Sequence, residues 1–285
     1  MADSARLTVR RRRLGRELRR IREELGWTQA KAARLMDRPA SSLAKIERAE
    51  QGLRQDELHA ILDAYRVADP QLRRFLLTLR RDASKRGWWN RYKNTLSPAT
   101  LDLISLEADA KVIRTFEALY LPGLLQTEAY MRAMLGVSVS GLRPSDQDEF
   151  VAVRLKRQEI LTCSRPPQYS LIIGEAALRQ MVGGPQTMSD QLSRVLEMAE
   201  FGHVKVRVLP FSAGANPGMN GAFTILEVGE WGELTVARVE ALTRAWYLED
   251  GDDLRRYSLA YDQLSSVALS EWDSRALIEC VRSAL

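Results

Sequence analysis

The chain has 285 residues, of which 45% are hydrophobic, enough for a sizeable core and most naturally arranged as two domains. No apolar run approaches the ~18 residues of a membrane span, and no apolar segment follows the arginine-rich start, so we expect a cytoplasmic protein without a membrane partner. Two cysteines without metal-ligand spacing exclude a disulfide scaffold and give no basis for a metal or cofactor site.

Positive charge is concentrated in the first third of the chain. Through residue 93 there are 24 Lys and Arg against 12 Asp and Glu, a balance of +12, and the other 18 and 25 give −7, for a net charge of +5. A basic module joined to an acidic one favours nucleic-acid binding by the first. The densest run is either a DNA-contacting arm or helix edge, which we favour, or a solvated helix face. It consists of Arg10, Arg11, Arg12 and Arg13.

The first 70 residues have the pattern of a small helical bundle that contains a helix-turn-helix. Apolar residues at spacings of four, three and four predict a first helix that ends at Gly26: Leu14, Leu18, Ile21 and Leu25. Thr28 suits the N-cap of a second helix over 29–36, and Pro39 interrupts the chain before a third. Further apolar residues, Leu58, Ile61, Leu62 and Tyr65, predict another helix. The third helix would carry three polar side chains outward: Ser41, Ser42 and Lys45.

Several of these residues also carry a family resemblance. Arg22, the segment Gly26-Trp27-Thr28-Gln29, Ala33 and the segment Lys45-Ile46-Glu47-Arg48 resemble the phage-repressor-like (xenobiotic-response-element, XRE) DNA-binding domains, whose third helix enters the major groove. The resemblance implies that Gln29 contacts phosphate or a flanking base and that Arg22 pairs with Glu47. It further implies that Ser41, Ser42 and Lys45 face base edges. Thr28 and Arg38 complete the predicted DNA-binding set.

Two positions depart from that family. Pro39-Ala40 replaces the polar cap and glutamine that commonly begin the recognition helix. Ala49 stands where glycine is common, and we expect Gly52 to take over the role of ending the helix. A first domain over 1–80 is therefore expected to bind double-stranded DNA.

A basic amphipathic stretch over 72–94 follows the predicted bundle. We expect residues 81–96 to form a linker helix with Trp88 and Trp89 as an anchor onto the next domain. The alternative is that these tryptophans stack on bases or on a ligand.

The remainder, 97–285, has mixed periodicity and predicts an α+β domain. The fold class is thus an all-α helix-turn-helix bundle followed by an α+β domain. Helices are predicted over 97–117, 126–135, 145–161, 175–181, 188–201, 250–266 and 270–283. Strands are predicted over 168–173, 204–209, 223–228, 234–239 and 245–248.

This second part also resembles a domain family of poorly defined function that follows helix-turn-helix heads in many actinobacterial regulators. The segments that carry the resemblance are Gly87-Trp88-Trp89, Leu106-Glu107-Ala108, the stretch 121–128 (LPGLLQTE), Arg157-Gln158-Glu159, the stretch 182–185 (VGGP), the stretch 208–214 (VLPFSAG) and Pro217-Gly218-Met219. The resemblance implies a transcription factor similar to antitoxin-like and development-associated regulators, which are often encoded beside a small partner protein.

An enzyme is not expected, because no nucleophile–base arrangement or nucleotide-binding glycine motif is present. Glu107, Glu117 and Glu128 could serve as paired carboxylates, but we interpret them as parts of solvated helix faces. A ligand or partner pocket is a further hypothesis, and ordinary core packing with a tight turn is its alternative. The candidate pocket residues are Phe116, Tyr120, Pro122, Phe211, Asn216 and Met219. A docking surface for a protein partner or second copy is the third possibility.

The patterns together predict a sequence-specific DNA-binding transcriptional regulator. We expect a dimeric repressor or autoregulator, because two heads on half-sites about 34 Å apart add their affinities. Its second domain would bind a small protein partner or an effector. The competing hypothesis is an antitoxin-like interaction module that neutralises a small partner, with DNA binding only autoregulatory.

Overall fold

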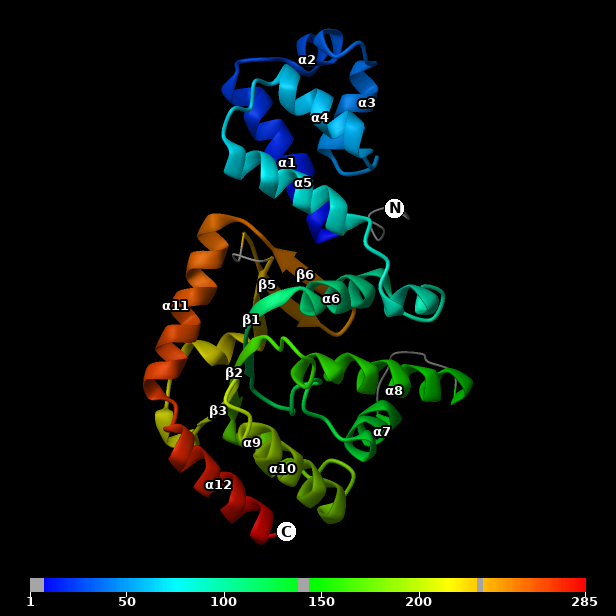
Figure 1. The fold of residues 1–285 in the computed structure, drawn as a ribbon. Coiled ribbons are helices and arrows are strands. Elements are labelled where there is room, and N and C mark those ends of the chain that lie inside the picture. The colour runs from blue at the N-terminus through cyan, green and yellow to red at the C-terminus, as the bar shows by residue number, and fades with distance from the viewer. Residues whose placement is uncertain (1–7, 138–143, 230–232) are drawn as a thin grey trace. The chain divides into compact units, whose positions relative to one another are not determined.

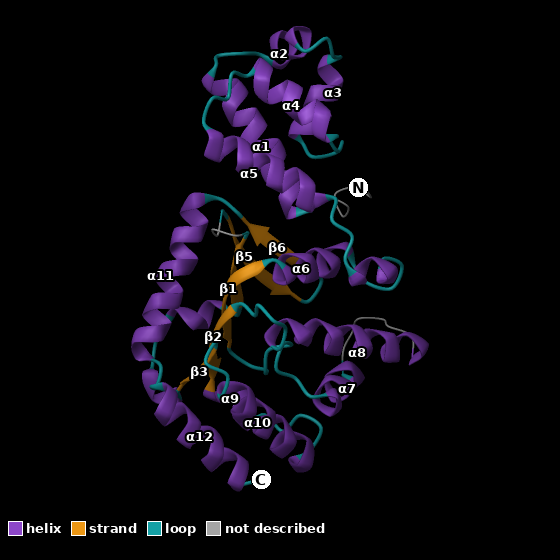
Figure 2. Ribbon diagram, viewed as in Figure 1, coloured by secondary structure: helices purple, strands orange, loops and turns teal. Residues whose placement is uncertain are grey.

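The computed structural model describes residues 8–137, 144–229 and 233–285. The chain divides into two compact units, Met1–Asp102 and Leu103–Leu285 (Figure 1). Their boundary lies within helix α6 (Pro98–Ala108), whereas the sequence placed the second domain from residue 97 after a linker over 81–96. The expected order, an all-α bundle followed by an α+β domain, is confirmed (Figure 2).

The first unit is a bundle of short helices. They are α1 (Val9–Glu24), α2 (Gln29–Leu35), α3 (Ala40–Glu47), α4 (Gln55–Ala64) and α5 (Pro70–Ala83). Their apolar faces meet in one core, whose fully buried members include Leu18, Leu43, Leu58, Ile61, Leu62 and Leu76. The periodic apolar residues of the sequence therefore form the centre of the bundle, except Leu25, which follows the end of α1 and is 37% exposed.

The turn after α3 differs from the sequence-based expectation. Ala49 itself adopts the left-handed conformation, with φ at 64°, and its N–H donates to the Ile46 carbonyl at 2.9 Å. Gly52 does not take over this role, since its φ does not lie in the left-handed region. The expectation for Gly52 was wrong because Ala49, only 1% exposed, is buried in place and the surrounding packing offsets the strain of an L-residue there.

The segment after α5 is not a linker helix. α5 ends at Ala83, and the Trp-Trp pair begins a short 3-10 helix, η2 (Trp88–Tyr92). The ring of Trp89 occupies the space beside Gly87, where an added Cβ would come within 2.2 Å of it. Trp89 and Tyr92 are buried and Trp88 meets both rings edge-on, so these side chains pack together instead of presenting free faces to bases.

The second unit contains one six-stranded sheet of order β3-β2-β1-β4-β5-β6. The strands are β1 (Ala110–Glu117), β2 (Gln168–Gly174), β3 (Val204–Leu209), β4 (Phe223–Val228), β5 (Leu234–Ala241) and β6 (Arg244–Leu248). β1, β2 and β3 are parallel, and β4, β5 and β6 extend the sheet by antiparallel pairing.

The first strand of this sheet was missed in the sequence. Residues 97–117 were predicted to be one helix, but α6 ends at Ala108 and β1 begins at Ala110. β1 is a central strand with β2 on one side and β4 on the other. Val112, Ile113 and Thr115 are β-branched and suit a pleated strand, but pairing on both sides, which no local window reveals, decides the conformation.

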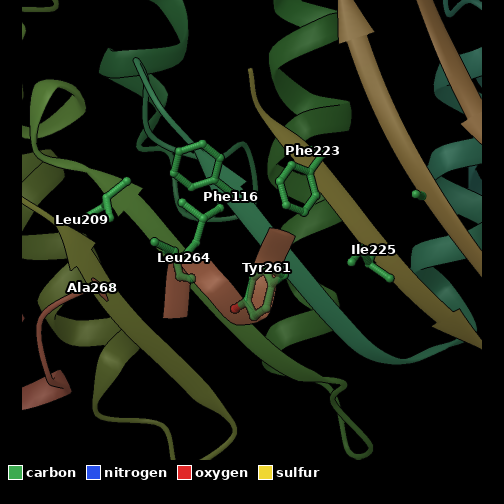
Figure 3. Packing of buried hydrophobic residues seen from close by; sticks show 9 residues of the cluster. Phe116, Leu209, Phe223, Ile225, Tyr261, Leu264 and Ala268 are labelled. Carbon is green, nitrogen blue, oxygen red and sulfur yellow. The ribbon is translucent and has the colours of Figure 1, made fainter. Parts of the chain in front are cut away.

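The remaining helices cover the two faces of the sheet. They are α7 (Glu128–Gly136), α8 (Pro144–Gln158), α9 (Glu175–Arg179), α10 (Pro185–Ala199), α11 (Gly251–Val267) and α12 (Glu271–Ser283). α11 and α8 lie on opposite sides of the sheet (Figure 1). On the α11 side, Phe116 and Phe223 from the sheet pack with Tyr261 and Leu264 from the helix (Figure 3). Tyr261 also donates to the Ser170 carbonyl at 2.9 Å and so fixes α11 to β2.

Candidate functional site

The helix-turn-helix is assembled from α2 and α3. The Thr28 hydroxyl caps α2 by accepting from the Lys31 N–H at 3.2 Å, and Ala32 and Ala33 are buried where α2 meets α3. α3 begins at Ala40 without a side-chain cap, since its N-cap position is Pro39. The outward face of α3 carries Ser41, Lys45 and Arg48, which are all exposed and lie at i, i+4 and i+7.

A buried ion pair holds α3 against α1. Arg22 donates to the two carboxylate oxygens of Glu47 at 2.6 and 3.0 Å, and also to the Trp27 carbonyl at 2.6 Å. The hydrogen bonds to Glu47 raise the pKa of Arg22. Gln29 donates to the same carboxylate at 2.8 Å. The pairing implied by the family resemblance is therefore present, and it fixes the angle of the exposed face of α3.

Some predicted DNA contacts have other partners in the structure. The Gln29 amide nitrogen is bound to Glu47, and Arg38 forms an ion pair with Glu57 of α4 at 2.7 Å. The Ser42 hydroxyl lies 3.5 Å from Gln51. Ser41 and Lys45 remain exposed, as predicted for residues that face DNA.

The arginine run 10–13 belongs to α1. Arg10 is only 3% exposed, so its guanidinium is unsuited to a surface phosphate contact, which corrects its place in the predicted set. Arg11, Arg12 and Arg13 are partly buried, and Arg13 pairs with Glu17 at 3.0 Å. Arg10 therefore occupies an inward position of α1, and the other three arginines of the run are partly accessible.

Several exposed cations of the first unit have carboxylate partners, including Arg48 after α3, which donates to both oxygens of Glu50 at 2.7 and 2.9 Å. The arginines Arg19 and Arg20 of α1 form ion pairs with Glu23 and Glu24 at 2.8 and 2.5 Å. By contrast, Lys31 lies over the Trp27 ring and Arg34 donates to a backbone carbonyl of its own helix. These two cations and Lys45 form the group that we name the α2–α3 basic face.

Each of the two parts of the chain matches a known protein family. Residues 13–76 match the family described as "Helix-turn-helix domain", which indicates a DNA-binding regulator. Residues 100–280 match the family described as "Domain of unknown function (DUF5753)". The chain belongs to the DUF5753 family. Searches of curated proteins and of solved structures found no match. Among the described residues, no helix combines the length and apolar character needed to cross a membrane.

The DUF5753 domain brings together three of the segments that carried the sequence resemblance. Arg157 of α8 binds both oxygens of Glu107 from α6, at 2.5 and 2.7 Å. Gln158 donates to the carbonyls of Gly123 and Gln126 at 2.9 and 2.8 Å, and Gln126 donates to the Leu121 carbonyl at 2.6 Å. The loop 121–127 is thus fixed by buried side-chain amides.

The three glutamates near this loop have different environments. Glu128 is an exposed residue of α7 paired with Arg132, as expected for a solvated helix face. Glu107 is 3% exposed and ion-paired, and Glu117 ends the central strand β1. Burial raises the pKa of Glu117 to about 8, and its Oε2 is buried without a hydrogen-bond partner. The interpretation as solvated helix faces was therefore wrong for Glu107 and Glu117.

The six candidate pocket residues do not surround one space. Phe116 lies in the core on the α11 side, and the ring leaves no room for a Cβ on Gly218, whose loop contains Asn216 and Met219. Glu117 follows Phe116 on the strand and so points to the opposite face, where Tyr120 hydrogen-bonds to it. Pro122 is buried, while Phe211 and Met219 are 64% and 77% exposed.

Proposed function

We propose that this chain is a sequence-specific transcriptional regulator that binds double-stranded DNA through α3. The observation that carries the proposal is the exposed face of α3, with Ser41, Lys45 and Arg48, held at a set angle by the buried Arg22–Glu47 pair. A helix presented in this way by a helix-turn-helix fits the major groove, where lysine and serine can contact base edges.

Within the α2–α3 basic face, the two cations of α2 would supply the backbone contacts. Lys31 and Arg34 are exposed, and cations that neutralise phosphates release counterions and strengthen binding at low salt. Phosphate contacts orient the protein without selecting sequence, so the specificity in this proposal rests on α3.

We infer that the regulator acts as a dimer and represses or autoregulates. One small head buries limited surface on DNA, and two heads on half-sites about one helical turn apart, roughly 34 Å, give both affinity and palindromic specificity. The DUF5753 domain would bind a small protein partner or an effector that modulates this activity.

The test compares the DNA upstream of the coding sequence with a random duplex of equal length across a salt series. We expect a preference for the upstream DNA that persists as salt rises. Lys45→Ala should weaken specific binding by about 1–3 kcal/mol and relax the preference if Lys45 contacts a base edge. The control is Lys93→Ala, which removes the same charge from an exposed position outside α2 and α3.

Equal, salt-sensitive binding to both DNAs would contradict sequence-specific regulation. Equal losses for Lys45→Ala on the two duplexes would make Lys45 a phosphate contact and would move the specificity elsewhere on α3. A response of Lys93→Ala as large as that of Lys45→Ala would show that only net charge matters.

A further inference from the structure

The face of the DUF5753 sheet opposite α11 carries a cluster of partly buried charged side chains. Strand alternation places Glu117 of β1 and Arg238 of β5 on this face, because their neighbours Phe116 and Ala237 lie in the core on the α11 side. Tyr247 of β6 is the register partner of Arg238. α8 adds Arg154 and Arg157 to the same cluster, since each interacts electrostatically with charged groups of this face.

Two of the three arginines in this cluster have carboxylate partners. Arg157 is bound bidentately by Glu107, and Arg238 is 2.7 Å from a carboxylate oxygen of Glu240. Each of these pairs is close to neutral. The third arginine, Arg154, has no such ion pair among the described residues.

Arg154 is partly buried, and its guanidinium forms no ion pair with a carboxylate among the described residues. Its Nη2 donates to the neutral amide oxygen of Gln126 at 3.0 Å, its Nε is buried without a hydrogen-bond partner, and its guanidinium lies 5.4 Å from the centre of the Phe150 ring. Burial and the neighbouring Arg157 lower the pKa of Arg154 to about 10. An arginine remains charged at neutral pH even so, and an uncompensated buried charge is costly.

The Pro122-Gly123 turn leaves room for these guanidinium groups. A Cβ on Gly123 would lie 3.0 Å from Nη2 of Arg154 and 3.2 Å from Nη1 of Arg157. Two like-charged groups thus approach the same point of a turn whose carbonyls are fixed by Gln158 and Gln126. Because Gly123 has no side chain, the guanidinium groups of Arg154 and Arg157 can both approach the turn at this position.

The other acid of the cluster does not supply the missing negative charge. Burial keeps the Glu117 carboxyl largely protonated at neutral pH, with a pKa of about 8. Arg238 also has a buried Nε without a hydrogen-bond partner. The face therefore combines a guanidinium that forms no ion pair, Arg154, with two guanidinium Nε donors that have no hydrogen-bond partner, the chemistry that binds an oxyanion.

We propose that Arg154, with Arg157 and Arg238, binds the oxyanion group of a small molecule on this face of the DUF5753 domain. Phosphate and carboxylate share the required chemistry, since both accept paired N–H donors from guanidinium groups. The role of such a ligand as an effector rests on the proposed regulatory function, whereas its binding does not. The binding test below contains no DNA and so distinguishes the two.

The experiment measures the melting temperature of the full-length protein in titrations with sodium phosphate and with sodium succinate, against sodium chloride at equal ionic strength. Saturable binding to the folded state raises stability by about 1.4 kcal/mol when the ligand is tenfold above its Kd, which is about 2–3 °C for a chain of this size. We expect this saturable rise with at least one of the two anions, and the responding anion identifies the chemical group.

Three variants locate the response. Arg154→Gln should lose the saturable rise in melting temperature on adding anion. Its melting temperature in chloride should be equal to or above that of the wild type, because the variant removes a charge without an ion-pair partner. Gly123→Ala should weaken the rise in melting temperature on adding anion without changing the net charge, because the new methyl displaces the guanidinium groups. Arg194→Gln, on the partly exposed surface of α10, should respond like the wild type.

The proposal is overturned if neither anion gives a saturable shift beyond that of chloride. It is equally overturned if Arg154→Gln retains the wild-type response. A lower melting temperature of Arg154→Gln in chloride, with an undiminished shift on adding anion, would assign Arg154 a purely structural role.

Discussion

Arg22 and Glu47 show how much of the head depends on single side chains. Glu47 has only 1% of its side chain exposed, and its oxygens are taken by Arg22 and Gln29. A buried carboxylate that loses its cation retains the cost of desolvation without compensation. These two residues therefore control both the stability of the bundle and the angle of α3.

Arg22→Ala should destabilise the protein by about 3–5 kcal/mol, because it leaves Glu47 buried and unpaired. The double variant Arg22→Met with Glu47→Met should be less destabilised than Arg22→Ala, since it removes both charges together. Chemical denaturation measures both values. An unchanged midpoint for Arg22→Ala would contradict a stabilising pair, and a double variant no better than the single one would contradict the argument from desolvation.

Glu117 makes a specific prediction for pH. Its folded pKa of about 8 lies above the roughly 4.3 of an unfolded glutamate, so the folded state holds a proton that the unfolded state has lost between these values. The contribution of Glu117 to stability is therefore present below pH 4 and declines as the pH rises towards 8. Above pH 8 no further decline follows from this residue.

The measurement is the free energy of unfolding of wild type and Glu117→Gln at pH 5.5 and pH 8. We expect the wild type to lose on the order of 2–3 kcal/mol more than the variant over this range. Glu128→Gln, on the exposed surface of α7, should follow the wild type. A constant difference between wild type and Glu117→Gln across the range would exclude the raised pKa.

At the scale of elements, the close crossing of α1 and α3 depends on a residue without a side chain. A Cβ on Gly15 would lie 2.6 Å from the Glu47 carbonyl oxygen and 2.8 Å from that of Ile46. Both neighbours are backbone atoms at the end of α3, so they can give way only if the helix moves. The contact lies on the same two helices that the Arg22–Glu47 pair joins.

Gly15→Ala should therefore destabilise the head by about 1–3 kcal/mol or more despite the better helix propensity of alanine. It should also weaken specific DNA binding, because displacing α3 misplaces its exposed face. Gly136→Ala is the matched control, since it lies in α7 with no atom within 4 Å of an added Cβ. Equal stability and equal DNA binding for the two variants would show that the α1–α3 crossing tolerates the methyl.

At the scale of the whole molecule, charge is divided between the two parts of the chain. The first 93 residues carry a balance of +12 and the rest −7, so attraction to DNA is concentrated in the helix-turn-helix part. The acidic DUF5753 part has no comparable surplus for a polyanion. Its buried arginine cluster suits one small anion and not an extended phosphate backbone.

The inferred dimer can be tested on the upstream DNA after nuclease footprinting has located the two half-sites. Adding 5 base pairs between the half-sites places the two half-sites on opposite sides of the DNA helix and should reduce affinity by at least about tenfold. Adding 10 base pairs returns both half-sites to the same side and should reduce affinity less. Electrophoretic mobility shifts at constant salt measure both. Equal affinity for the three spacings would contradict two heads bound in fixed register.

Features that depend on neighbours along the chain could be predicted from the amino-acid sequence. The Thr28 cap, the break at Pro39 and the apolar periodicity of the first helices are local, and the structure has each of them in place. The Arg22–Glu47 contact was accessible only through the family resemblance, since 25 residues separate the two side chains.

The tertiary structure alone decided which charged residues are buried and which strands meet. Residues 110–117 are a strand because they pair on both sides, and this pairing separates Phe116 from Glu117 across the sheet. Arg10, Glu107, Glu117 and Arg154 resemble surface residues in any local window, yet the fold buries Arg10 and Glu107 and partly buries Glu117 and Arg154. Burial and charge compensation depend on contacts between distant segments, so the candidate anion site could not be found from periodicity or composition.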